Sequence, residues 1–274
     1  MRVRPLLSGE ILISRSFSMH PHGLLGSQRG TLRQVMRRGM RWAPVPVFLL
    51  EHPQRGPVLV DTGYSATVNS APAKTLGFAT AHLFKHRAYD LDALLEAAGV
   101  RARDIELVLM THLHTDHASG LDRFAHATIA ADRLEWAAAE RGSAYCKPVI
   151  EAVTRRQLLD YDDPAAGTLD GFALPTLDPF GDGSVTLIST RGHAAGHQSL
   201  LVRCASGRRV LLLGDAAHIA DQLIDHTPQA YLDDPGRFRT TLRILRAWLD
   251  ENPDVVVIPG HDPELWPQLE AVYE

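Results

Sequence analysis

The sequence is poor in cysteine, with only Cys146 and Cys204 in 274 residues. Two cysteines are too few for a disulfide scaffold and neither belongs to a C-x-x-C pair, so we expect a reducing, cytoplasmic location. Long apolar runs are also missing, because none approaches the roughly 18 residues of a membrane helix. The apolar stretch at the N-terminus is broken at residues 8–10, before it reaches the length of a signal core. We therefore expect no membrane partner.

Neither sign of charge dominates the chain. It has 28 lysines and arginines against 32 aspartates and glutamates, spread along its length, with a formal net charge of -4. Such a balance provides no field that would attract nucleic acid, so we expect no nucleic-acid partner. The 45% hydrophobic and 22% charged content excludes a disordered, collagenous or coiled-coil chain. There is no evident repeat or linker, so we expect a single domain over residues 1–274.

Short apolar runs that end in a polar or glycine-containing turn recur along the sequence and predict buried strands. They cover residues 58–60, 105–110, 185–189, 210–213 and 255–258. Apolar residues at helical spacing predict helices over 91–98 and 236–249, and residues 200–213 predict a hairpin. Strands and helices mixed in this way indicate a layered α/β or α+β domain. The less regular stretches 64–90 and 141–182 are expected to be insertions or lids over a site.

Histidine is unusually frequent, with 14 copies, and the densest group of histidines directly follows the predicted strand 105–110. It reads His112-Leu113-His114-Thr115-Asp116-His117. Packed without a counter-ion, such imidazoles and a carboxylate would leave unpaired polar atoms that cost about 1 to 3 kcal/mol each. A divalent metal ion removes this cost. The alternative interpretation is an exposed histidine-rich loop.

Three further ligand-type residues follow other predicted strands: His193 in GHAAGH, Asp215 in GD and His261 in PGH. Imidazole nitrogen and carboxylate oxygen suit zinc and similar ions, and strand ends hold such side chains rigidly. With the first group they make seven ligands, enough for two divalent metal ions. Zinc is the default metal, although cobalt, manganese and iron accept the same ligands.

The series HLHTDH, RGHAAGH, GD and PGH, preceded by VLVDTG, resembles the metallo-β-lactamase fold superfamily over residues 45–262 or so. Within it, the flanks VPVFLLEHPQRGPVLVDTGY, GHAAGHQSLLV and PGHD are most similar to the quorum-quenching N-acyl homoserine lactonases. The resemblance implies a metal-dependent hydrolase with a four-layer αβ/βα sandwich of the α+β class.

The resemblance also implies how the ligands divide between the two metals. One ion would be bound by His112, His114 and His193, the other by Asp116, His117 and His261, and Asp215 would bridge them. Asp61 resembles a residue that orients the metal loop through the second nitrogen of a ligating imidazole. The alternative for Asp61 is a turn-forming role before a Thr-Gly pair.

The sequence departs from the lactonases at one position. Many of them carry a tyrosine three residues after the bridging aspartate, where it hydrogen-bonds the substrate, but this chain has His218. A histidine there is either a replacement hydrogen-bond donor or a surface residue. We predict that Asp116 or His218 supplies a proton during catalysis, and that His197 supports the ligands.

Two divalent ions would lower the pKa of a bridging water, and the resulting hydroxide would attack the carbonyl of a small-molecule lactone. The resemblance favours N-acyl homoserine lactones. The same chemistry serves thioesters, phosphotriesters and β-lactams, which stay open as alternatives. A non-enzymatic metal-binding protein is a third hypothesis, but a structural zinc needs only four ligands.

A groove for an acyl chain is expected where apolar residues belong to no predicted strand or helix. These residues are Phe17, Met19, Leu24 and Leu25 near the N-terminus, and Leu76, Phe78, Leu83 and Phe84 after the Asp61 turn. The alternative is that they complete the core or a dimer contact. A monomer and a homodimer are both compatible with the sequence.

Overall fold

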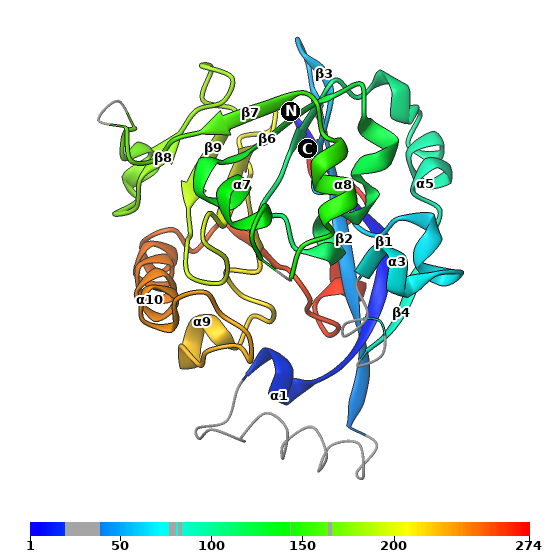
Figure 1. The fold of residues 1–274 in the computed structure, drawn as a ribbon. Helices are drawn as coiled ribbons and strands as arrows, with labels where there is room; N and C mark the ends of the chain where they lie inside the picture. Colours follow the sequence, from blue (N-terminus) through cyan, green and yellow to red (C-terminus); the bar gives the residue numbers. More distant parts are fainter. Residues whose placement is uncertain (20–38, 77–80, 82–83, 143, 164–165) are drawn as a thin grey trace.

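The computed structural model describes residues 1–19, 39–76, 81, 84–142, 144–163 and 166–274. Within these residues the chain forms two mixed β-sheets with helices on their outer sides, and α10 lies on the opposite side of the molecule from α5 (Figure 1). In this part of the chain, no helix is both long and apolar enough to cross a membrane.

The larger sheet holds both ends of the predicted metal loop in place. Its strands β3, β5, β6 and β7 run parallel, while β4, β1, β2 and β3 pair in antiparallel fashion. The order across the sheet is β4 (Lys85–Ala88), β1 (Arg2–Ser14), β2 (Met40–His52), β3 (Gly56–Val60), β5 (Leu107–Leu109), β6 (Thr128–Asp132) and β7 (Arg156–Leu159).

The smaller sheet carries the remaining predicted ligands. Its strands β8 to β11 are antiparallel neighbours, and β12 lies parallel to β11 at the edge. The order is β12 (Val256–Pro259), β11 (Arg209–Gly214), β10 (Gln198–Arg203), β9 (Val185–Ser189) and β8 (Thr176–Leu177).

The helices are short except for the last one. They are α1 (Arg15–Ser18), α3 (Pro72–Leu76), α5 (Leu91–Ala97), α6 (Thr115–Ala118), α7 (Arg133–Ala139), α8 (Lys147–Ala152), α9 (Gln222–Asp225) and α10 (Pro235–Glu251). Both α5 and α10 begin at an aspartate whose carboxylate accepts hydrogen bonds from the first free amides of the helix, namely Asp90 and Asp234.

Successive side chains of the strands alternate between the core that separates the two sheets and the helices that cover them. In β2, Leu50 faces the core between the two sheets, whereas Leu49 belongs to a cluster with residues of α5, α7 and α8. In β11, Leu212 lies in the same central core, whereas Leu211 packs with the apolar side of α10. Successive side chains of a strand point to opposite faces, so each sheet is covered on both sides. The expected four-layer α+β sandwich is therefore confirmed.

The five predicted strands, the hairpin and both predicted helices are present, with ends shifted by a few residues at most. The stretches 64–90 and 141–182, expected to be insertions or lids, are more regular than predicted. The first contributes β4 to the larger sheet, and the second contributes β7 and β8. These strands are too short and too polar to stand out in the sequence, and pairing with a neighbouring strand stabilises them.

Candidate metal centre

The seven predicted ligands follow the ends of four strands. One of these strands belongs to the larger sheet and three belong to the smaller sheet. The segment from His112 to His117 follows β5 of the larger sheet. His193, Asp215 and His261 follow β9, β11 and β12 of the smaller sheet. The structure brings all seven side chains into one cluster at the same end of the two sheets.

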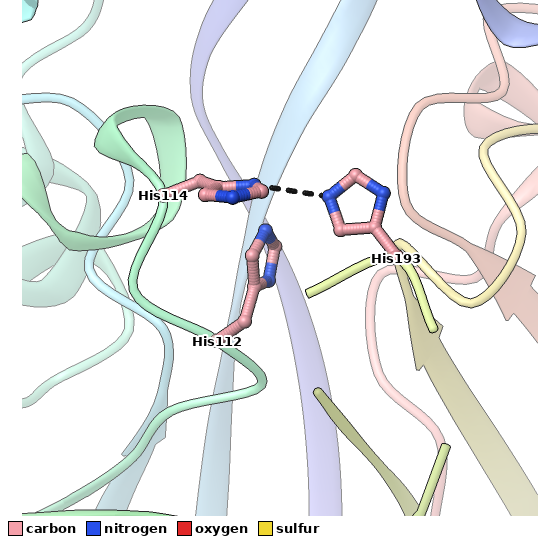
Figure 2. Close-up of side chains that lie close together, drawn as sticks. All are labelled: His112, His114 and His193. Atoms are coloured by element: carbon pink, nitrogen blue, oxygen red, sulfur yellow. Dashed lines mark hydrogen bonds between the residues drawn. The ribbon is translucent and has the colours of Figure 1, made fainter. Parts of the chain in front are cut away.

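Four groups of three ligand-type side chains converge among the described residues. Two of them contain Asp215, one with His112 and His117 and the other with His193 and His218. The two groups without Asp215 have no residue in common. The first is His112, His114 and His193, whose rings surround a common point (Figure 2). The second is Asp116, His117 and His261, and in each group the ligand atoms lie within 4.8 Å of one another. The Nδ1 atom of His114 and the Nε2 atom of His193 are 3.0 Å apart.

Asp215 lies between the two groups and turns one carboxylate oxygen to each. Its Oδ1 atom is 3.4 Å from Nε2 of His117 and 3.2 Å from Nε2 of His261. Its Oδ2 atom is 3.3 Å from Nε2 of His193 and 3.9 Å from Nε2 of His112. Gly260 makes this approach possible, because a Cβ at that position would lie 2.4 Å from Oδ1 of Asp215.

Hydrogen bonds on the far side of the rings fix which nitrogen of each histidine faces the cluster. Nδ1 of His261 lies 2.7 Å from the main-chain oxygen of Pro44, and Nδ1 of His117 lies 2.8 Å from Oδ2 of Asp61. Both oxygens accept only, so each Nδ1 carries the proton and donates it. The Nε2 atom of each ring therefore points at the carboxylates, where it can bind either a proton or a metal ion.

Asp61 organises the metal loop as well as His117. Its carboxylate accepts hydrogen bonds from the amide and the hydroxyl of Thr111, both at 2.7 Å, in addition to that of His117. Because the Thr111 hydroxyl donates to Asp61, its oxygen is free to accept from Nδ1 of His112 at 3.1 Å. Asp61 adopts a left-handed φ of 58° directly after β3, so the turn-forming role and the orienting role occur together.

Three polar atoms of the cluster are buried without a hydrogen-bond partner among the described residues. They are Nε2 of His112, Nε2 of His117 and Oδ1 of Asp215. Leaving such atoms bare costs about 1 to 3 kcal/mol each, and a coordinated cation removes that cost. Imidazole nitrogen with carboxylate oxygen is a donor set that zinc and similar divalent ions accept. The residues present therefore fit a metal centre.

The electrostatics of the site differ between the two groups of histidines, and both groups suit a bound cation. Burial lowers the pKa values of His112, His114 and His193, that of His114 to about 4, so these rings are neutral near pH 7. Burial alone would also lower the pKa of His117, but the carboxylates of Asp215 and Asp61 overcome it and raise the pKa. The same negative charge attracts a metal ion, which would replace the proton.

Glu135, at the start of α7, fastens the two ligand-bearing loops to each other. Its buried carboxylate accepts the amide of Leu113 at 2.9 Å and the amide of Gly196 at 2.8 Å. Gly196 has no room for a side chain, because a Cβ there would lie 2.4 Å from the main-chain nitrogen of Glu135. The Tyr145 hydroxyl adds a further hydrogen bond, so three donors share this carboxylate.

His218 is buried at the cluster and is not the surface residue that the sequence left open. Its Nε2 atom lies 3.1 Å from Oδ2 of Asp215, and its ring stacks on Phe17 with 5.9 Å between ring centroids. Its Nδ1 atom has no partner in the described part of the chain. A proton on Nε2, donated to the carboxylate, is therefore the better tautomer. Burial lowers the pKa of His218, so the ring is a neutral donor.

A cavity of about 520 Å³ opens onto the cluster. His114, Asp116 and His218 line its floor, and an apolar side is formed by Ile11 and Ile13 of β1 and by Phe17 of α1. Phe84 joins this wall and packs edge-on against Phe17. Of the remaining groove candidates, Leu76 is buried in a core cluster and Met19 does not line the cavity. Leu24, Leu25, Phe78 and Leu83 lie outside the described residues.

Several residues that support the cluster were not found from the sequence. Besides Glu135, Gln229 contacts both His193 and Asp215, and His197 accepts the Asp215 amide at 2.9 Å. His197 was expected to support the ligands, although its contact with a main-chain amide was not foreseen. Glu135 and Gln229 stand in otherwise ordinary helix and loop sequence, and a single sequence holds no signal that marks them.

Comparison with known proteins agrees with this geometry. The model of the metallo-beta-lactamase superfamily matches residues 40–261. An N-acyl homoserine lactonase, AttM, of Rhizobium radiobacter is 30% identical over 244 residues, which cover 84% of this chain and 86% of that protein.

Two solved structures share the fold. One is AiiA of B. thuringiensis, in a variant with N-decanoyl-L-homoserine bound at the active site. It has a TM-score of 0.78 and 22% identity, covering 98% of this chain and 96% of that one. The other, AidC, is a dizinc quorum-quenching lactonase in complex with a product. Its TM-score is 0.65 at 15% identity, covering 96% of this chain and 87% of that one.

Proposed function

Since the chain belongs to the metallo-beta-lactamase superfamily, it is a metal-dependent hydrolase, and we propose that it opens the lactone ring of N-acyl homoserine lactones. One observation carries the proposal: seven ligand-type side chains converge, and five of them line a cavity that also has an apolar wall. The 30% identity to a lactonase over most of both chains supports the choice of substrate.

We assign His112, His114 and His193 to one divalent ion, Asp116, His117 and His261 to a second, and Asp215 to both. The two converging groups support the division, and the two oxygens of Asp215, each facing one group, support the shared role. Elemental analysis of protein purified without chelator should find about two metal ions per chain, with zinc the first expectation. Full activity at one ion per chain or fewer would contradict the assignment.

Bound at these residues, the ions would supply Lewis-acid polarisation of the lactone carbonyl and a water of lowered pKa as nucleophile. The chain's own residues position the substrate and move the proton. His218 lines the cavity with its Nε2–H donated to Oδ2 of Asp215, and it would donate to a developing negative charge on the substrate once that carboxylate binds the metal ions. Asp116 lines the same floor and is a second proton carrier. Ring opening leaves the alcohol tethered, so the product is one hydroxy acid.

The cavity favours an uncharged substrate with an apolar tail. Two carboxylates of its described lining, Asp116 and Asp215, are assigned to the metal ions, and the rest of that lining offers Asp233 but no lysine or arginine that would pair with a carboxylate of the substrate. Acyl homoserine lactones are neutral, whereas β-lactam antibiotics and glutathione thioesters carry carboxylates. The aromatic pair Phe17 and Phe84 offers apolar surface where an acyl chain can be buried, at roughly 0.8 kcal/mol for each methylene.

A substrate panel tests the proposal. Purified enzyme is assayed for proton release with N-butanoyl, N-hexanoyl and N-decanoyl homoserine lactones, and in parallel with nitrocefin, a glutathione thioester and a phosphotriester. We expect kcat/KM to be highest for a homoserine lactone. A higher kcat/KM for any of the other three substrates than for every lactone would refute the proposal. His114→Ala and Asp215→Ala should abolish most of the activity.

A further inference from the structure

Gln229 lies in the connection between α9 and α10 and has both ends of its side-chain amide engaged at the metal centre. It is only 2% exposed. Its Nε2 atom donates to the main-chain oxygen of Asp215 at 2.9 Å, and its Oε1 atom lies 2.5 Å from Nδ1 of His193. One side chain thus connects two of the proposed ligands.

The first of these bonds determines the direction of the second. A main-chain oxygen only accepts, so the nitrogen of the Gln229 amide must face Asp215 and its oxygen must face His193. An amide oxygen also only accepts. Nδ1 of His193 therefore carries the proton, and the unprotonated Nε2 faces Oδ2 of Asp215 at 3.3 Å. Without Gln229, the nearby carboxylate oxygen of Asp215 would favour the other tautomer of His193, with the proton on Nε2.

The segment that carries Gln229 is fastened to the His193 loop along its length and forms a wall of the substrate cavity. The amide of Asp233 donates to the main-chain oxygen of His193, and that of Asp234 donates to Gly192. Tyr231, Leu232 and Asp233 line the cavity. The same short segment therefore contacts both the substrate space and a proposed ligand.

We propose that Gln229 is a positioning residue for the metal centre, one that holds His193 in its ligating tautomer and fixes the ring relative to Asp215. The inference rests on the proposed function in so far as His193 is a ligand there. It assigns to a neutral amide the task that Asp61 performs for His117 and the Pro44 carbonyl for His261. Because Gln229 is neutral, it orients the ring without adding a charge to the site.

Three measurements on metal-free and metal-loaded protein test the proposal. Long-range ¹H–¹⁵N NMR on ¹⁵N-histidine protein reads the tautomer of His193 directly, and we expect the proton on Nδ1. Competition with a chelator measures Zn²⁺ affinity, and the Co²⁺ absorption spectrum reports the ligand geometry. Gln229→Met keeps the size of the side chain but removes both hydrogen bonds. It should weaken Zn²⁺ binding by about 10- to 100-fold and change the Co²⁺ spectrum.

Gln229→Glu separates orientation from packing. It keeps an acceptor for His193 but cannot donate to Asp215, so it should bind Zn²⁺ more tightly than Gln229→Met. If Gln229→Met does not fold, two other results decide the question. One is the tautomer of His193 in the wild type, and the other is the Zn²⁺ affinity of Gln229→Glu, which should be below that of the wild type. The matched control is Gln198→Met, which removes a buried amide with two hydrogen bonds, to Tyr161 and Met110. It should lower the melting temperature and leave the Zn²⁺ affinity unchanged.

The proposal is overturned if His193 carries its proton on Nε2 in the wild type, or if Gln229→Met binds Zn²⁺ as tightly as the wild type. The substrate panel is independent of both results. A wild-type protein that binds two Zn²⁺ ions with the expected tautomer but opens no lactone would refute the proposed reaction and leave the role of Gln229 standing. A wild-type protein that binds no divalent ion would refute both.

Discussion

Replacing Asp61 by asparagine should disable metal binding by changing a single proton position. The carboxylate of Asp61 is 3% exposed and accepts three hydrogen bonds, two from Thr111 and one from Nδ1 of His117. An asparagine can keep its oxygen towards the Thr111 amide, but its NH₂ group then faces His117. Nδ1 of His117 would have to accept, so the proton would move to Nε2 and point at Asp215.

The structure gives the magnitude of the effect. Losing the orienting partner of a ligating histidine typically costs 10- to 100-fold in metal affinity. Asp61→Asn should therefore weaken Zn²⁺ binding by that factor, with about 1 to 2 kcal/mol lost from the metal-free protein because one charge-assisted hydrogen bond is replaced. Asp61→Ala leaves three buried donors without an acceptor and should lose about 3 to 5 kcal/mol. Chelator competition measures the affinity and urea unfolding the stability.

Asp170 provides the control for the backbone. It is another aspartate with a left-handed φ, 57°, and it lies away from the metal cluster, where it bonds Thr186 and Arg203. Asparagine tolerates such a φ at both positions. Asp170→Asn should lower stability without changing Zn²⁺ affinity. If Asp61→Asn binds Zn²⁺ as tightly as the wild type, the tautomer argument is wrong.

Three further predictions concern other parts of the site. Burial lowers the pKa of His197 to about 3, below the ordinary 6.5, so its stabilising effect is complete above pH 6.5 and decreases as the pH falls towards 3. Between pH 7 and pH 5, the free energy of urea unfolding of the metal-free protein should fall by about 2 kcal/mol more in the wild type than in His197→Gln. Equal falls in the two proteins would refute this prediction. Phe84→Ala should reduce kcat/KM more for N-decanoyl than for N-butanoyl homoserine lactone, and a lower melting temperature with equal effects on both would place Phe84 in the core instead. Glu135→Gln keeps one acceptor for the loop amides and should weaken Zn²⁺ binding less than Glu135→Met, as chelator competition would show; equal affinities would mean that the carboxylate does not position the loops.

The strands that carry ligands were predictable because each is an apolar run that stops abruptly at a polar turn. The strand pair β1 and β2 was not predicted, although it forms the longest pairing in the structure. Charged and small residues interrupt the apolar pattern of β1, and Pro44 and Pro46 interrupt that of β2. Both prolines fall in the half of β2 that pairs only with β1, since β3 pairs with it from Phe48 onwards. Where β2 has a neighbouring strand on one side only, a proline can direct its nitrogen to the open side and remove no hydrogen bond between strands.

The side chains proposed as ligands could be named from the sequence, but the residues that contact and support them could not. Metal-binding side chains are limited to a few residue types, and their concentration after strands is visible in one dimension. The residues that orient them need only an acceptor at the right distance, which a glutamine, a glutamate, a threonine or a main-chain oxygen provides equally well. Gln229 and the oxygen of Pro44 show this, because they do the same task from positions 36 and 217 residues away from the histidines they hold.

The proposed metal assignment also has a consequence for how the two sheets hold together. In each proposed group, ligands from the larger sheet combine with one from the smaller sheet: His112 and His114 with His193, and Asp116 and His117 with His261. Each ion would therefore join the sheets at the edge where their apolar core ends, and Asp215 would join the ions to each other. Because the hydrophobic effect is non-directional whereas metal–ligand distances are narrowly defined, the metal centre would add to the packing of the core a second, more specific constraint on how the sheets meet at the active site.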